Sequence, residues 1–425
     1  MTISLKKSFR EGFTLSQPEM LFTILLLLTP VWWLLGVQVV LYPVVVVGAM
    51  AFGVIKFPNV KFPAPGWSWL AMALVMAFTA FIGLGSVGFE PMKVLAQVLA
   101  FIKGYFLIFS CLVLPCLWQL RTVHIRRAVV GLAILYLITI VISLFAFLVG
   151  FKVHYYDPIL SQLTPGEVLS LRVFIGMGLQ PFFGVMFPRT ALFTADPPIL
   201  GICALVVICI CCQEQDQRLR ALALTGASLA LLFSFSRTSW LCLPVIFTVY
   251  FCLRSGTAMR ISLWLGALGS MICGLVSLAP NELIDTILGV VNQARASSST
   301  DRNRVITKTL EAWEESPWLG WGIIQGSVRW HTYDIALGSF STYSAVLYLH
   351  GVLGLCFLIA AMGITLWHFT ALAFKGNVDA AWATASLVAL YICCASTPLT
   401  WMAPVLWFYF LWLGTVLQDA QWEAV

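Results

Sequence analysis

Apolar runs of about 20 residues recur along this chain, with short polar breaks between them. Wound as an α-helix, a run of this length crosses the hydrocarbon core of a bilayer. Lipid also permits closed barrels, but barrel strands are shorter and alternate apolar with polar residues. Of the 425 residues, 10% are charged, against about 25% in a soluble domain. The sequence therefore predicts an all-α, polytopic integral membrane protein.

We predict about twelve transmembrane helices in a single membrane domain, residues 1–425. Lys6, Lys7 and Arg10 precede the first apolar run, and no small-residue cleavage site follows it, so a cleavable signal peptide is not expected. The sequence suggests neither an internal repeat nor a separate soluble domain. The predicted spans cover about 20–36, 38–55, 67–85, 94–116, 128–150, 197–212, 221–236, 239–253, 261–278, 343–369, 380–395 and 401–417.

Basic residues orient these helices, because short cytoplasmic loops carry an excess of Lys and Arg. With a cytoplasmic N-terminus, every short inner loop holds at least one basic residue, and the short outer loops are nearly bare. We therefore predict that both termini are cytoplasmic, and that the net charge of +6 reflects topology rather than a nucleic-acid surface. The inward cations are Lys6, Lys7, Arg10, Lys56, Lys61, Arg121, Arg126, Arg127, Arg218, Arg220, Arg254, Arg260 and Lys375.

Two outer segments, 151–196 and 279–342, are too long to be simple connectors. The second is predicted to contain an amphipathic helix at about 301–316, with Thr300 as its N-cap. This helix is expected to lie on the outer membrane surface or to cap a cavity. We expect the chemistry of the protein in these two periplasmic loops.

Two outward arginines are candidates for binding an anion. Arg237, in "SFSRTSW", lies between two predicted spans among hydroxyl residues, and Arg189, in "FPRTALFTADPPILG", comes just before the sixth span. A guanidinium stays charged, and its forked donors match phosphate oxygens, so the two side chains could converge on one anion. The alternative is that each reaches lipid headgroup phosphates on its own. Other outward cations include Arg302 and Arg304.

Lys103 lies inside the fourth predicted span, in "LAFIKGYFLIF". An ionisable group at that depth is costly, so Lys103 either helps to bind an anion or pairs with a buried acid or carbonyl. The outer loops hold His331 and His154, and His331 is the first candidate for a general base at neutral pH; an inert loop histidine is the alternative. The twelve cysteines lie almost entirely within spans and show no metal-ligand spacing.

Four motifs follow one another between about 185 and 360: "RTALFTADPPILG", "SFSRTSWL", "RNRVITKTLEAWEESPWLGWG" and "LGSFSTYSAVLYLHGVLGL". In this order, and within a twelve-span frame, they resemble the family of O-antigen ligases and O-antigen (Wzy-type) polysaccharide polymerases. The second motif resembles that family's Ser-Arg-Thr/Gly segment. The third resembles its loop helix followed by Pro-x-Leu-Gly-x-Gly.

The resemblance implies a GT-C-type glycosyltransferase of the bacterial inner membrane with an active site that faces the periplasm. Members of the family take a glycan from undecaprenyl diphosphate on the outer leaflet, and they need neither a metal nor another cofactor. The arginines that hold the diphosphate correspond to Arg189 and Arg237 here. Cations in a dry site would neutralise the charge that grows on the departing diphosphate.

One position departs from the family's Gly-Ser-His-Ser-Thr-Tyr stretch, because Phe340 stands in place of the histidine. A phenyl ring cannot accept the proton of the acceptor hydroxyl, so the base is His331, or an acid such as Asp334, or the activity is altered. Nearby aromatic residues are candidates for stacking on sugars, although Trp and Tyr also anchor proteins at membrane interfaces. The predicted substrate-binding residues are Arg302, Arg304, Lys103, Ser339, Ser341, Tyr343 and Trp321, with Trp318, Trp330 and Tyr333 as further stacking candidates.

The leading hypothesis is a polymerase that joins undecaprenyl-diphosphate-linked repeat units of an exopolysaccharide, capsule or O-antigen, with a chain-length co-polymerase as its partner. The first alternative is a ligase that transfers the glycan to lipid A–core. A transporter of lipid-linked oligosaccharide is a third hypothesis, but it would place charges near the midplane and often shows two related halves. A silent relative that binds glycan lipid without catalysis is the fourth, and Phe340 favours it.

Overall fold

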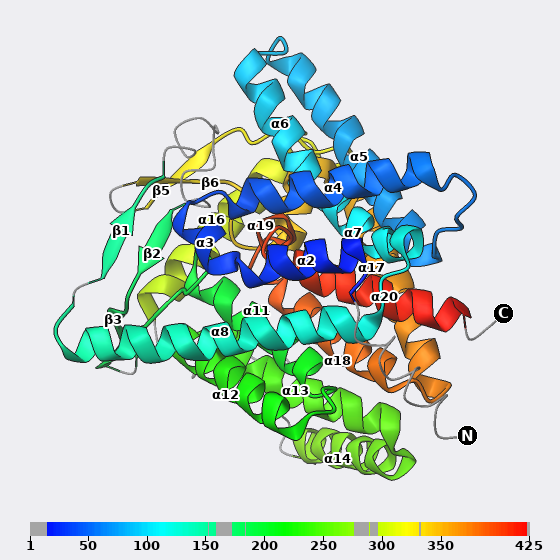
Figure 1. Ribbon diagram of the computed structural model, residues 1–425. Coiled ribbons are helices and arrows are strands. Elements are labelled where there is room, and N and C mark those ends of the chain that lie inside the picture. The colour runs from blue at the N-terminus through cyan, green and yellow to red at the C-terminus, as the bar shows by residue number, and fades with distance from the viewer. Residues whose placement is uncertain are drawn as a thin grey trace.

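The computed structural model describes residues 15–151, 153–158, 172–182, 184–275, 289, 296–330 and 333–422. Most of this part of the chain is helical, and long helices run side by side in a bundle (Figure 1). The hairpins of both long outer segments lie at one end of the bundle, whereas α2 (Gln17–Leu27) begins and α20 (Trp407–Trp422) ends toward the other (Figure 1). The two long segments therefore share one side of the bundle.

Each predicted span coincides with one helix or with two successive helices. Three of the predicted spans are divided, between α2 and α3, between α6 and α7, and between α19 and α20. The remaining helices of the bundle are α3 (Thr29–Leu34), α4 (Gln38–Lys56), α5 (Ala64–Ser86), α6 (Pro91–Lys103), α7 (Tyr105–Trp118), α8 (Thr122–Leu148), α11 (Pro197–Cys211), α12 (Gln217–Ser234), α13 (Arg237–Arg254), α14 (Gly256–Leu275), α17 (Thr342–Phe374), α18 (Val378–Cys393) and α19 (Leu399–Met402).

Six helical stretches in the described part of the chain are long and apolar enough to cross a membrane, and further apolar helices are shorter. The structure therefore supports the membrane class. Twelve crossings and the GT-C architecture stay predictions. The six stretches are Gln38–Lys56, Ala64–Ser86, Pro91–Trp118, Thr122–Leu148, Gly256–Leu275 and Thr342–Phe374.

The structure is mostly helical, as predicted, and it adds three short antiparallel hairpins that were not predicted. Their strands are short, with no more than 5 residues each. Strands of this length leave little periodic signal beside apolar runs of about 20 residues, which is why the sequence did not reveal them. The pairs are β1 (His154–Tyr156) with β2 (Val173–Ile175), β3 (Gly178–Phe182) with β4 (Val185–Arg189), and β5 (Ser327–Trp330) with β6 (Tyr333–Ala336).

The helix predicted at 301–316 is α16 (Ala296–Glu314). It begins earlier than expected, so Thr300 lies within the helix, and the prediction that Thr300 caps it is wrong. The side chains of Val305 and Thr309 are buried. The two are four positions apart, so one face of α16 packs against the protein.

The bundle separates into inner and outer helices. Pro198–Cys211 of α11 is buried throughout, and so is most of α7. In α14, by contrast, none of the residues is buried. A helix that is apolar on all sides belongs either in a core or in lipid. We therefore assign α7 and α11 to the core and α14 to the periphery, where lipid covers it.

Candidate functional site

Arg237 begins α13 at a sharp corner between two helices. α12 ends at Ser234, and Phe235 takes the left-handed conformation with φ 47° and ψ 37°. Ser236 then occupies the N-cap position of α13 with an extended backbone. A left-handed residue commonly ends a helix, although phenylalanine adopts this conformation less readily than glycine or asparagine. The polar break thus reverses the chain and leaves Arg237 in the first turn of α13.

Arg189 reaches the same corner from a different element. It is the last residue of β4, and its Nε donates a hydrogen bond of 2.9 Å to the carbonyl oxygen of Ser234. The Thr190 amide donates to the Phe233 carbonyl at 3.1 Å. Both carbonyls belong to the last turn of α12, where helix carbonyls lack internal partners and a cation is favoured by the helix dipole. The hairpin β3–β4 is therefore docked on the α12–α13 corner.

The two arginines differ in exposure. Arg189 is 8% exposed, and Arg237 is half-buried. A basic side chain at the first residue of a helix opposes the positive end of the helix dipole, so the charge of Arg237 does not stabilise α13. A guanidinium beside a helix N-terminus is instead suited to an anion.

α11 packs closely against the α12–α13 corner. A Cβ on Gly201 of α11 would come within 2.7 Å of Ser236 Cβ and of Ser239 Oγ. The hydroxyl groups of Ser236 and Ser239 are themselves hydrogen-bonded at 2.8 Å. Because α11 approaches so closely at Gly201, the hydroxyl groups of Ser236 and Ser239 are tightly packed between α11 and the start of α13.

An aromatic cluster fixes the hairpin β3–β4 to the corner. The ring centroids of Phe182 and Phe187 each lie 5.4 Å from that of Phe235. Trp240 of α13 lies at the same distance from Phe235, and its Nε1 donates to the Leu231 carbonyl at 2.8 Å. Aromatic pairs stabilise a defined ring geometry, and this effect adds to the stabilisation from the apolar area that they bury. They hold the bulky Phe235 in its strained conformation.

An ion pair lies on the neighbouring hairpin β1–β2. Arg172 donates two hydrogen bonds to Asp157, at 2.7 and 3.0 Å, and this guanidinium holds the pKa of the Asp157 carboxyl below its usual value. Partial removal from water raises the pKa of Tyr155, while the charges of Arg172 and Arg189 oppose that rise. Tyr155 therefore lies within electrostatic reach of Arg189, and the two hairpins are neighbours.

α16 brings Arg302 onto Phe340, the residue that replaces the expected histidine. The guanidinium carbon lies 5.2 Å from the centroid of the ring, which is a cation–π distance. The buried Nε of Arg302 has no hydrogen-bond partner among the described residues, whereas Arg304 is exposed. The Gly338 amide donates to Thr309 Oγ1 at 3.0 Å, so α16 is tied to the chain just before α17.

The turn Pro317–Gly322 inserts between α5 and α17. On one side, a Cβ on Gly322 would overlap the Thr79 carbonyl of α5. On the other side, α17 kinks at Gly351, with φ 63° and ψ −164°. The kink and the turn exchange four backbone hydrogen bonds: donor first, these are Trp321 to Tyr348 (2.9 Å), Gly322 to Leu349 (2.8 Å), Val352 to Pro317 (2.9 Å) and Leu353 to Trp318 (3.2 Å).

Several predicted substrate-binding side chains bond to the protein's own backbone. Ser339 Oγ, Tyr343 OH and Trp321 Nε1 donate to backbone carbonyls at 2.5, 2.8 and 2.8 Å. Ser341 is buried at the N-cap position of α17. These contacts position the loop and the start of α17, and the role of the four side chains in binding sugar stays a prediction.

Two other predicted residues are not brought to the α12–α13 corner by any described contact. Lys103 is 9% exposed and ends α6, and the non-helical Gly104 separates it from α7. The cation is therefore buried at a helix break. His331 lies outside the described residues, and so do the side chains of Trp330 and Tyr333.

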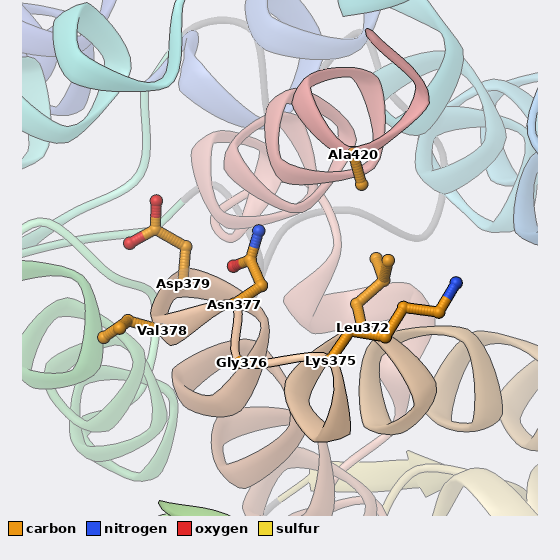
Figure 2. A pocket seen from close by; sticks show the side chains of 7 residues that line it. All are labelled: Leu372, Lys375, Gly376, Asn377, Val378, Asp379 and Ala420. Atoms are coloured by element: carbon orange, nitrogen blue, oxygen red, sulfur yellow. The ribbon is translucent and has the colours of Figure 1, made fainter. Parts of the chain in front are cut away.

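A cavity of about 600 Å³ opens at the remote end of α13. Arg254, the last residue of α13, donates to the Gly376 carbonyl there at 2.9 Å. Figure 2 shows Lys375, Asn377 and Asp379 at the turn between α17 and α18, with Ala420 of α20 above them. Because this turn is one of the predicted cytoplasmic loops, we separate the cavity from the site at Arg237.

The comparison with known protein families identifies one match. Residues 221–359 match the family model described as O-antigen ligase. The matched segment includes Arg237, Arg302, Phe340 and the kink at Gly351, but it begins after Arg189. No curated protein matches the chain.

Proposed function

We propose that this chain, whose residues 221–359 match the O-antigen ligase family model, polymerises undecaprenyl-diphosphate-linked oligosaccharide repeat units at the periplasmic face of a bacterial inner membrane. The family implies a membrane enzyme that transfers glycosyl groups between a lipid-linked donor and an acceptor. One observation carries the proposal for the site: Arg189 hydrogen-bonds to the Ser234 carbonyl at the corner where Arg237 begins the next helix.

In the proposed reaction, the guanidinium groups of Arg189 and Arg237 bind the diphosphate of the donor. The N-terminus of α13 adds its dipole to the same side. The acceptor hydroxyl attacks the anomeric carbon, the bond from that carbon to the diphosphate oxygen breaks, and the negative charge on the departing diphosphate grows. Fixed positive groups stabilise that charge most effectively where water is scarce, and the burial of Arg189 supports this role.

The general base in this proposal is His331, because Phe340 cannot accept a proton. Asp334 is the alternative, and its carboxylate lies 3.4 Å from Arg329 Nη1 on the hairpin β5–β6. Arg302, which covers Phe340, is the third cation that we assign to substrate.

A polymerase and a ligase differ in the acceptor, which is a second lipid-linked repeat in one case and lipid A–core in the other. We favour the polymerase because the Gly-Ser-x-Ser-Thr-Tyr form around Phe340 resembles exopolysaccharide polymerases. A chain-length co-polymerase would be its partner in the same membrane. A ligase remains the second candidate, since the matched family carries that description.

The test uses the purified full chain in nanodiscs with undecaprenyl-diphosphate oligosaccharide as donor. Arg237→Gln should lower the rate of glycan transfer about 100-fold or more, which is the usual effect of removing one hydrogen-bond donor to an anion that develops in the transition state. Arg237→Lys should restore only part of the rate, because an ammonium group lacks the forked donors of a guanidinium. Arg172→Gln is the matched control: it removes an arginine that is already paired with Asp157, and it should keep activity. Products that lengthen without lipid A–core identify the polymerase.

Wild-type turnover in Arg237→Gln would refute the diphosphate site. Transfer of the glycan to lipid A–core alone would reassign the protein as a ligase. Movement of the lipid-linked glycan between leaflets without any new glycosidic bond would replace the enzyme with a transporter.

A further inference from the structure

A groove of about 430 Å³ lies between α2 and α4. α2 packs on α8 and α4 packs on α7, so a space remains between the two helices, which lie near each other in Figure 1. The groove is lined mainly by apolar side chains, which include Leu21 and Phe22 from α2 and Val44 and Phe52 from α4. Its volume is in the range of small-ligand pockets.

The shape of the groove depends on Gly48 and Trp118. A Cβ on Gly48 would meet nothing within 4 Å, so the missing side chain keeps the groove open. Trp118 is fixed against α4, because its Nε1 donates to the Ala49 carbonyl at 3.1 Å and its ring stacks on Phe52 with centroids 5.8 Å apart. The groove is therefore preformed rather than a chance gap between mobile side chains.

A cation lies beside this apolar groove. Lys56 ends α4, and its Nζ lies 5.4 Å from the centroid of the Trp118 ring and 5.3 Å from that of Phe57. Within the part of the chain that the structure describes, Lys56 has no carboxylate within salt-bridge distance, whereas Arg121 is paired with Glu19 at 2.7 Å. Lys56 thus offers an uncompensated positive charge at an aromatic rim.

We propose that this groove binds an anionic phospholipid of the membrane, with one acyl chain between α2 and α4 and the phosphate at Lys56. Apolar surface in contact with the chain and one cation at the headgroup are the two features that such a lipid requires. The groove lies near the basic turns predicted to be cytoplasmic. The proposed diphosphate site belongs to the opposite end of the bundle, so the isoprenoid carrier is not the expected occupant.

The test uses the full chain in nanodiscs of phosphatidylcholine with a minor fraction of phosphatidylglycerol that carries a photoreactive diazirine in one acyl chain. Adducts should concentrate on peptides from α2 and α4. Gly48→Trp should reduce these adducts several-fold by filling the groove. The matched control is Gly363→Trp, on an exposed and equally open position of α17, and it should leave the α2 and α4 adducts unchanged.

Lys56→Gln leaves the groove open and tests the headgroup separately. It should lower the preference for phosphatidylglycerol over a phosphatidylcholine probe about fivefold, the weight of one cation at an anionic surface. Adducts spread evenly over lipid-facing helices such as α14 would overturn the proposal, as would unchanged labelling in Gly48→Trp. Stronger labelling of the groove by a photoreactive isoprenoid diphosphate would overturn it as well. None of these outcomes depends on glycosyl transfer.

Discussion

The kink at Gly351 should be highly sensitive to substitution. Its φ of 63° and ψ of −164° belong to a region that is essentially restricted to glycine, and another residue there costs about 1–3 kcal/mol. A Cβ at this position would also overlap the backbone carbonyl of Trp318. Because that obstacle is backbone, a change of rotamer cannot relieve it, and the turn Pro317–Gly322 must move away from α17.

Moving the turn breaks some or all of the four backbone hydrogen bonds at the kink. Each contributes about 0.5–1.5 kcal/mol net, so the loss of two or more, together with residual strain, predicts about 2–4 kcal/mol of destabilisation for Gly351→Ala. Gly363→Ala is the control on the same helix. A Cβ there meets nothing within 4 Å, and replacing a helical glycine by alanine usually stabilises by about 0.5–1 kcal/mol.

The assay is reversible unfolding of both variants in the same mixed micelles, followed by tryptophan fluorescence because Trp318 and Trp321 lie on the turn. The two substitutions are chemically identical and should have opposite signs. Equal stability of the two variants, or a more stable Gly351→Ala, would refute the assignment of the kink as the partner of the inserted turn.

Three further predictions concern the outer face. Gly201→Ala should destabilise the α12–α13 corner by about 1–3 kcal/mol through overpacking against Ser236 and Ser239; normal unfolding with lost transfer would point to a functional role of the glycine instead. His331→Ala should abolish the lower limb of the pH–rate profile of transfer, while Asp334→Asn should preserve it; the reverse result would make the aspartate the base. Arg172 lowers the pKa of Asp157, so this pair stabilises the hairpin β1–β2 above the usual titration range of aspartate and loses that effect as the pH falls through the lowered folded value. Hydrogen exchange in the hairpin should therefore show a pH dependence, of at most about 1 kcal/mol for an exposed pair, that disappears in Asp157→Asn.

The membrane class and most helices were predictable because lipid imposes length and apolarity on a span. Boundaries were less predictable, since charged turns continue as helix beyond the hydrocarbon. α8 begins at Thr122 and includes Arg126 and Arg127, although the apolar run suggested a start near 128. The side chain of Arg126 is buried, with its Nε 3.9 Å from Glu214, which is a tertiary contact that no local pattern reveals.

The candidate site was predictable in its residue types and much less in its geometry. The motifs indicated Arg189 and Arg237, but hydrophobic patterning does not show that a β-hairpin carries the first to the helix end beside the second. Glycines within the apolar runs could have indicated close helix packing or a kink, although they did not enter the prediction. Gly201 and Gly351 both lie in apolar helical runs, where glycine is unfavourable in water unless packing or a kink requires it.

The inserted turn also constrains the order in which the protein can be built. Its polar backbone groups find partners on α17, which follows it in the chain, and it packs on Thr79 of α5, which is made much earlier. Exposed amides and carbonyls are not tolerated in hydrocarbon, so the turn has to wait at the aqueous surface until the later helix has entered the membrane beside the earlier one. Insertion of the turn Pro317–Gly322 between α5 and α17 would then be a final step of biogenesis. A chain that ends before α17 could not complete this step.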